Sequence, residues 1–217
     1  MKTIMTALIM FGSAISAFAQ FDASKITVGI NGNYTMYKGN FDKAGMGAQV
    51  RVGYAMSEKI STHLGFTYTM PIIQESSVLI ADDNGNTIDV PSEISYKFKT
   101  ISLIGSYHLI GDNETSGSLY AQFGPGLVLV SYKEDITGSY DKTTYLYPQN
   151  QVEKTSEMGF TLNFGIGGQY RIGKPIVFAE VGYALPANTV NEEYVENVIP
   201  SHLMFNFGVK LPLGSSK

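Results

Sequence analysis

The stretch MGFTLNFGIGGQYRI, residues 158–172, alternates between two chemistries along its whole length. One set of alternate positions, here called the apolar parity, consists of Met158, Phe160, Leu162, Phe164, Ile166, Tyr170 and Ile172. The other parity holds Gly159, Thr161, Asn163, Gly165, Gly167, Gln169 and Arg171. A period of two places the parities on opposite faces of a β-strand, whereas a helix with these residues has no apolar face. The stretch also exceeds the roughly five or six residues of an ordinary globular strand, so it predicts a long strand with two different faces.

The same alternation recurs along the chain. Seven further segments carry it, at 25–37, 44–56, 60–72, 94–109, 118–132, 175–185 and 201–213. Two of them are less regular. The apolar parity switches near Lys99 and Thr100, which predicts a bulge, and both parities become apolar from Leu127 to Val130. The sequence therefore predicts an all-β protein of eight antiparallel strands.

The polar parity shows which solvent the strands meet. It is made of Gly, Ser, Thr, Asn and Gln with few charges, and only 16% of the chain is charged against roughly 25% in an ordinary soluble domain. Such a parity fits a narrow polar interior, with the apolar parity facing lipid. Tyrosines near the strand ends fit interfacial girdles: Tyr34, Tyr37, Tyr54, Tyr68, Tyr107, Tyr120, Tyr132, Tyr170 and Tyr183. The alternative is a soluble lipocalin-like barrel with apolar residues inside, which needs a charged outer face that these strands lack.

The connections alternate in length. Short links at 57–59, 110–117 and 173–174 alternate with mostly longer ones at 38–43, 73–93, 133–155 and 186–198. Short turns on one side and long loops on the other are typical of outer-membrane barrels. Asn84-Gly85, flanked by β-formers, predicts a hairpin that projects beyond the membrane. We therefore expect an eight-stranded antiparallel up-and-down transmembrane β-barrel in the cell outer membrane, in contact with outer-membrane lipid.

The first 19 residues, MKTIMTALIMFGSAISAFA, predict a cleaved signal peptide. Lys2 precedes an apolar segment at 4–11, and Ala17-Phe18-Ala19 matches the small-residue cleavage pattern. A buried N-terminal helix is the alternative. Residues 20–217 then form the barrel domain. The absence of Cys excludes disulfides, thiolate zinc sites and a lipid-modified cysteine.

Four charged residues fall on the polar parity of the predicted strands: Arg51, Arg171, Glu180 and Lys210. A buried carboxylate without a partner is costly, so we expect Glu180 to form an ion-pair network with these cations. The network is expected to pack and plug the barrel. A proton or ion path is the alternative.

The sequence offers little for catalysis or for metal binding. Only His63, His108 and His202 are available as bases, and none belongs to a His-x-Ser motif. Asp82-Asp83-Asn84-Gly85-Asn86 fails the spacing of a calcium loop. The formal net charge is −4, and no basic block is present to bind nucleic acid. We expect no enzymatic activity, no cofactor and no metal.

Several segments together resemble a known family. They are Ala17-Phe18-Ala19-Gln20 at the signal end, FKTISLIGSYHL at 98–109, LYAQFGPGLVLV at 119–130 and the stretch at 158–172. These resemble the small outer-membrane β-barrel domain family common in Bacteroidetes, which includes PorT-like and OmpX- or OmpA-like barrels. The chain departs from the usual outer-membrane ending, because it closes in GSSK rather than a terminal Phe. The resemblance implies the fold and an outer-membrane location, and it implies no particular function.

These observations favour a monomeric, non-enzymatic barrel with a structural or surface-binding role. Loops 73–93 and 133–155 would contact an extracellular protein or other surface ligand. Three alternatives stay open: a narrow pore or transporter for water, ions or small solutes, an accessory barrel of a secretion machinery, and a soluble lipocalin-like binder.

Overall fold

The computed structural model describes residues 22–38, 43–82, 84–145, 155–187 and 199–214. The predicted signal peptide lies outside these residues. The elements in chain order are η2 (Ala23–Lys25), β1 (Ile26–Tyr37), β2 (Ala44–Ala55), β3 (Ile60–Thr69), β4 (Ile72–Ala81), β5 (Thr87–Ile110), β6 (Gly117–Ile136), β7 (Thr155–Arg171), β8 (Ile176–Pro186) and β9 (His202–Pro212). Within the described part of the chain, no helix is long and apolar enough to cross a membrane.

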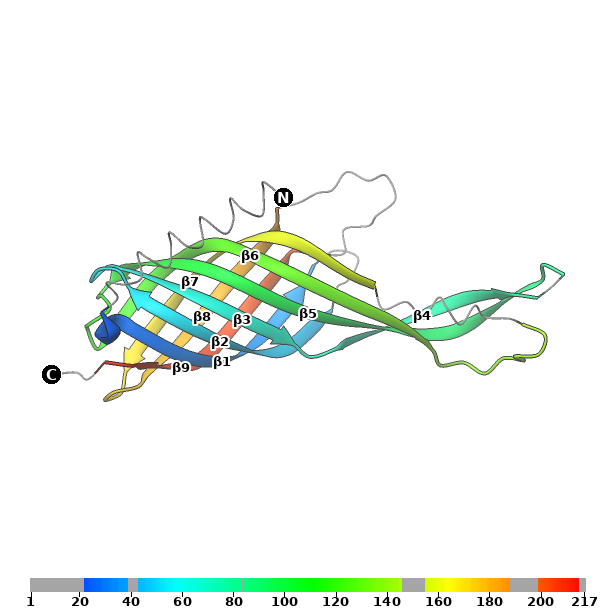
Figure 1. Ribbon diagram of the computed structural model, residues 1–217, viewed down its shortest axis with the longest axis horizontal. Helices are drawn as coiled ribbons and strands as arrows, with labels where there is room; N and C mark the ends of the chain where they lie inside the picture. The colour runs from blue at the N-terminus through cyan, green and yellow to red at the C-terminus, as the bar shows by residue number, and fades with distance from the viewer. Residues whose placement is uncertain (1–21, 39–42, 83, 146–154, 188–198, 215–217) are drawn as a thin grey trace, which may run out of the picture.

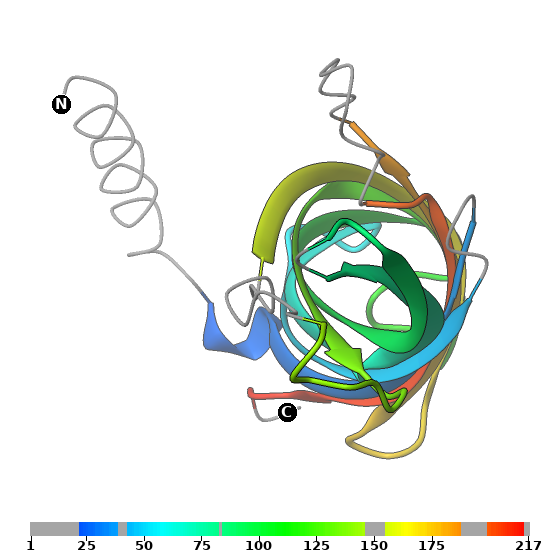
Figure 2. The same cartoon turned by 90° about the vertical axis from the view of Figure 1, so that its right-hand side faces the viewer.

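Eight of these strands close into a barrel. Each barrel strand pairs antiparallel with its neighbours, β3 pairs directly with β5, and β1 pairs with β9 to complete the ring. Strand β4 lies outside the ring and pairs with the first part of β5. Figure 1 shows the barrel and the ribbon that projects from it, and Figure 2 shows the ring from the projecting side. The predicted eight-stranded antiparallel up-and-down barrel is confirmed.

The two ends of the barrel differ as the connection lengths predict. At the turn end, successive strands are linked by residues 56–59, 111–116 and 172–175, and the start of β1 meets the end of β9. Gly111 and Gly173 have φ of 68° and 67° there, a conformation that favours glycine in a tight turn. At the other, hairpin end, β4 and β5 extend outward. In barrels of this kind the short turns face the periplasm and the long connections face outside.

The apolar parity faces outward. On β1, Ile30 is 61% exposed while its neighbour Asn31 is 3% exposed. On β9, Phe207 is 69% exposed beside the buried Gly208. A barrel with an apolar outside and a polar inside is stable in lipid and insoluble in water, so the lipocalin-like alternative is wrong.

Strand β5 has no bulge at Lys99 and Thr100, contrary to the sequence prediction. It keeps its register with β3 and β6 through both residues, and the register shifts instead between His108 and Ile110. The apparent change of parity arises because Phe98 points inward and is only 3% exposed. An apolar residue on the inward face looks, in sequence, like a strand that has turned over.

Phe98 belongs to an apolar cluster that fills the hairpin end of the lumen, here named the outer plug. Its buried members are Tyr37, Ile72, Phe98, Val128 and Val130. Tyr37 stacks on Phe98 with the ring centroids 4.6 Å apart. The plug explains why both parities are apolar from Leu127 to Val130, because one parity meets lipid and the other meets Phe98.

The tyrosine girdle forms only in part. Tyr34, Tyr68, Tyr107 and Tyr170 are exposed on the outer surface. Tyr37 and Tyr120 are instead buried inside the barrel, at 4% exposure each, so their assignment to the girdle is wrong. Both hydroxyls have partners in the lumen, Thr69 and Glu180 respectively.

Candidate functional site

The middle of the lumen is occupied by an ion pair between Arg51 of β2 and Glu180 of β8. Nη1 of Arg51 lies 2.7 Å from Oε1 of Glu180, and Nη2 lies 2.9 Å from Oε2. The side chains are 6% and 2% exposed. This is the parallel, two-bond geometry that makes Arg–carboxylate pairs strong.

Further polar groups form hydrogen bonds with both members of the ion pair. Asn31 accepts from Nε and Nη2 of Arg51 at 3.3 and 3.0 Å, and the Tyr120 hydroxyl donates to Oε1 of Glu180 at 2.9 Å. The guanidinium also lies 4.1 Å from the ring centroid of Phe178. A buried pair with its remaining hydrogen bonds made is far less costly than an isolated buried charge.

Glycines leave room for these side chains. Gly29 stands next to Arg51 on β1, and a Cβ there would meet Cγ of Arg51 at 3.1 Å. Gly167 stands next to Glu180 on β7, and a Cβ there would meet the Tyr120 ring at 2.6 Å. The inward Gly positions of the sequence pattern therefore accommodate long charged side chains from neighbouring strands.

The other two predicted cations lie on the inward face and make different contacts. Arg171 donates from Nη2 to the backbone oxygen of Asn113 at 3.2 Å. Nζ of Lys210 lies 6.0 Å from the centroid of the Tyr120 ring. Among the described residues, Arg51 is the only cation within 4.0 Å of Glu180. The expectation that Arg171 and Lys210 pair directly with Glu180 is therefore wrong.

The lumen is divided into compartments. A cavity of about 820 Å³, here named the turn-end cavity, extends from the turn end to Arg51, Tyr120 and Glu180. A cavity of about 50 Å³ lies beyond Glu180, lined by residues that include Gln49, Thr67 and Asn163. Only about 10 Å³ is found beside Phe98 and Val128 in the outer plug. The described residues therefore leave no wide path through the barrel.

The division of the lumen predicts that the protein does not conduct. Purified protein in planar lipid bilayers is expected to give no stable conductance steps in molar KCl, because the ion pair and the outer plug block the lumen. Stable steps from a single barrel would contradict the structure. They would favour the narrow-pore alternative.

One serine–histidine pair is formed that sequence reasoning missed. Nδ1 of His108 on β5 lies 3.0 Å from Oγ of Ser118 on β6. The residues are ten positions apart and meet because β5 and β6 pair, so no local motif marks them. Ser118 is 6% exposed and lines none of the three cavities described above, whereas His108 lines the turn-end cavity. Among the described residues, no group of three His, Cys, Asp or Glu side chains could hold a metal ion.

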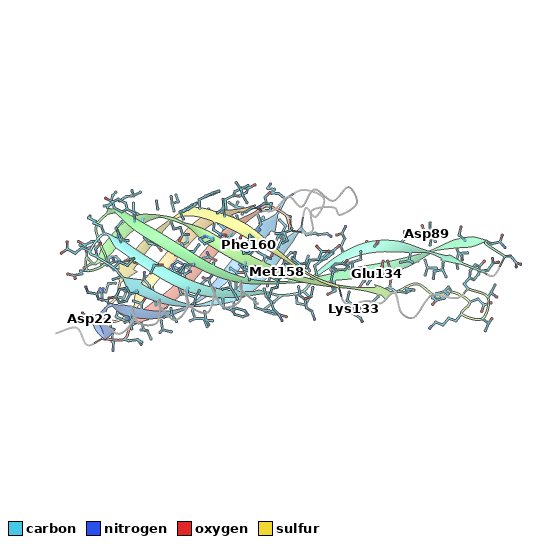
Figure 3. The ribbon with its side chains drawn as sticks, turned by 45° about the horizontal axis from the view of Figure 1, so that its top comes forward. Asp22, Asp89, Lys133, Glu134, Met158 and Phe160 are labelled. Atoms are coloured by element: carbon cyan, nitrogen blue, oxygen red, sulfur yellow. The ribbon has the colours of Figure 1, made fainter. Side chains whose placement is uncertain are left out.

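The hairpin end carries a projecting sheet made of β4, the first part of β5 and the end of β6. Figure 3 shows Asp89, Lys133 and Glu134 on this sheet, well beyond Met158 and Phe160 on the barrel wall. Strand β6 runs beside β5 as far as the pair Ser92–Ile136. The prediction of a projecting hairpin in 73–93 is confirmed, and the start of 133–155 extends with it.

Asn84-Gly85 lies in the turn of this hairpin, as predicted. Gly85 has a φ of 82°, and Asp82 accepts hydrogen bonds from the backbone nitrogens of Asn84 and Asn86 at 2.9 and 2.7 Å. A hydrogen bond from the Asn86 side chain, together with these two backbone bonds, lowers the pKa of Asp82. In the loop after β6, hydrogen bonds from Thr143 and Thr144 lower the pKa of Asp141 to about 2. Both carboxylates therefore stay charged at physiological pH and can accept these hydrogen bonds.

One face of the projecting sheet is covered. Ile80 and Val90 are each 2% exposed, and Gly138, in the chain after β6, packs against Val90. The backbone nitrogens of Thr137 and Gly138 both donate to the oxygen of Pro91 at 3.0 Å. The projection is therefore a packed sheet with a small apolar core of its own.

Strand β4 has a free edge in the part of the chain that the structure describes. The backbone N–H of Asp82 donates to Asn86 at 2.9 Å, which places the even-numbered residues of β4 in the hydrogen-bonded pairs with β5. The odd-numbered residues therefore direct their backbone groups away from β5: Ile73, Glu75, Ser77 and Leu79. Within the described residues, the sheet ends at β4, apart from an isolated bridge between Asp82 and Tyr145 at the tip.

Solved structures share this fold. Neisserial surface protein A is 12% identical with a TM-score of 0.53, and the match covers 87% of this chain and 97% of that one. A major outer membrane protein from Thermus thermophilus is 12% identical with a TM-score of 0.55, covering 86% of this chain and 98% of that one. No protein-family model matches the chain, and no curated protein matches it significantly.

The barrel and its outward apolar face define the class of the protein, and these solved structures share its fold. It is a small outer-membrane β-barrel with a projecting sheet and a charged lumen that the described residues divide into compartments. The finer resemblance to PorT-like barrels of Bacteroidetes stays a prediction.

Proposed function

We propose that the protein is a non-enzymatic, monomeric outer-membrane barrel that binds an extracellular partner through the free edge of β4. The partner would add an extended segment of its own chain to the projecting sheet. The observation that carries the proposal is the row of outward backbone groups at Ile73, Glu75, Ser77 and Leu79. Such an edge is a template for another strand, because each unpaired N–H and C=O gains a hydrogen bond.

The rest of the molecule fits this role. The barrel anchors the sheet, and the continuous strands β5 and β6 connect the two. The covered face at Ile80 and Val90 keeps the sheet rigid, so little ordering entropy is lost when a strand is added. The outward side chains Ile73 and Leu79 are 54% and 71% exposed beside the edge, and they offer apolar contacts to the partner.

A proline at Ser77 tests the proposal. Ser77→Pro removes one outward N–H and leaves the β4–β5 hydrogen bonds in place, because Ser77 lies in a non-hydrogen-bonded pair opposite Pro91. Peptides are selected by phage display against the protein in nanodiscs, and their affinities are then measured for each variant. We expect Ser77→Pro to weaken binding roughly tenfold, from one lost hydrogen bond and the steric effect of the ring on the added strand.

Ser77→Ala is the matched control, because it removes the hydroxyl and keeps the backbone N–H. It is expected to bind the selected peptides as the wild type does. Equal binding by the wild type and Ser77→Pro would show that the peptides use another surface. The proposed edge would then be rejected.

A further inference from the structure

The turn-end cavity carries charges that the ion pair does not use. We propose that this cavity binds a small water-soluble solute bearing a phosphate group, held by Arg171 and Lys210. The cavity lies at the opposite end of the barrel from β4, so the inference does not rest on the proposed function.

A row of inward-facing residues crosses five adjacent strands, and three of its members are the cations Arg51, Lys210 and Arg171. Register pairs Arg51 with Gly29, Gly29 with Lys210, Lys210 with Ile176 and Ile176 with Arg171. Arg51, Lys210, Ile176 and Arg171 all line the turn-end cavity. With two strand spacings between them, the Cα atoms of Lys210 and Arg171 are roughly 10 Å apart, and their long side chains can converge on one small anion.

Lys210 and Arg171, the other two cations of this row, have no carboxylate partner among the described residues, unlike Arg51. No described carboxylate lies within 4.0 Å of Lys210 or Arg171. Nε of Arg171 has no hydrogen-bond acceptor and almost no accessible surface, so the guanidinium must turn toward the cavity for a ligand to reach this N–H. A guanidinium N–H left unpaired inside a barrel is costly, and a phosphate oxygen is the acceptor whose geometry and charge match it best.

The charge of the whole lining favours a dianion. Six basic and four acidic side chains line the cavity, a surplus of two positive charges, whereas the whole chain carries −4. Of the acidic groups, Glu180 is held by Arg51 and Asp22 accepts from Ser24. A phosphate monoester carries nearly two negative charges at neutral pH and matches this surplus.

Access to the cavity is from water. Its lining includes Ser57, Glu58 and Lys174 of the turns, so it opens along the barrel axis at the turn end. Lipid surrounds the outside of the barrel and does not face this opening. A volume of about 820 Å³ accommodates a sugar phosphate or another solute of that size.

The experiment is a calorimetric titration of the full-length folded protein in maltoside micelles with inorganic phosphate as the probe. We expect saturable binding with a Kd of roughly 1 mM or below, weakened by added salt. Arg171→Gln and Lys210→Met are each expected to weaken it about tenfold, the loss of one charge-assisted hydrogen bond. The matched control is Lys142→Gln, which removes the same charge from the exposed loop after β6 and is expected to leave the affinity unchanged.

Three results would overturn the proposal: no saturable binding by the wild type, wild-type affinity in both cavity variants, or an equal loss in Lys142→Gln. Folding of every variant is checked by its heat-modifiable migration on gels. If one of the two cavity variants does not fold, the other is sufficient to test the proposal. The titration is repeated in nanodiscs of phosphatidylcholine and of phosphatidylglycerol. Equal affinities support a soluble ligand, and loss of binding in phosphatidylglycerol would assign the site to a lipid headgroup.

Discussion

Glu180→Ala is expected to lower the free energy of unfolding of the barrel by about 3–5 kcal/mol, the usual cost of breaking a buried ion pair. The reason is that the Arg51 guanidinium stays buried at the middle of the lumen after its carboxylate is gone. The hydrogen bond from Tyr120 is lost as well, and it leaves a second polar group without its partner. The measurement is a urea titration of protein folded into phospholipid vesicles. The chain has no Trp, so the folded fraction is read by heat-modifiable gel migration and by circular dichroism.

Two controls separate the buried charge from other effects of the substitution. The double variant Arg51→Met with Glu180→Met removes both charges and keeps much of the volume, so it is expected to recover most of the lost stability. Asp135→Ala breaks an ion pair with Lys133 whose side chains are both 52% exposed, and it is expected to cost at most about 1 kcal/mol. A loss for Glu180→Ala as small as that for Asp135→Ala would show that water reaches Arg51 freely.

Val50→Arg is expected to cost about 2–4 kcal/mol, the penalty for placing a cation on the lipid face near the bilayer midplane. Val50 is 53% exposed in the middle of β2, between the outward residues Ile30 and Phe66 of the flanking strands. Its neighbour Arg51 is 6% exposed on the inward face. The same residue type is therefore stabilised at position 51 and strongly disfavoured at position 50. The same urea titration measures the effect.

Ser77→Arg is the matched control for the lipid face. It adds the same side chain to the projecting sheet, outside the membrane, and is expected to change the stability by less than about 0.5 kcal/mol. In a soluble barrel the outward Val50 position would meet water, and Val50→Arg would then be neutral. A neutral result in vesicles would contradict the transmembrane assignment of this face.

Local patterns were enough to predict the barrel. Alternation along a strand depends only on which face each residue occupies, and this face is fixed by the two-residue period of the backbone. Residues 158–172 therefore predicted their own inward and outward sides, and β7 follows them. Asn84-Gly85 predicted its turn for an equally local reason, because few residue pairs adopt that backbone. The alternation of short and long connections predicted the two ends.

Which side chains meet inside the lumen depends on closure of the ring. Arg51 and Glu180 are 129 residues apart, and the ring places them on strands that face each other across the lumen. The sequence predicted a network of Glu180 with Arg51, Arg171 and Lys210, and it named the last two as neighbours because their strands are adjacent in the chain. Adjacent strands hold their side chains side by side, however, and among the described residues Arg51 is the cation that reaches the carboxylate, from across the lumen.

The same cause explains the inward tyrosines and Phe98. A strand seen alone shows only that one face is apolar and the other polar, so an apolar residue on the polar face looks like an error of register. Only the closed barrel shows that Phe98, Tyr37 and Val128 meet one another at one end of the lumen. The sequence by itself determined the strands, their faces and the membrane that the faces require. The tertiary structure decided which inward side chains meet, because side-chain contacts across a lumen are set by ring closure and have no period along the chain.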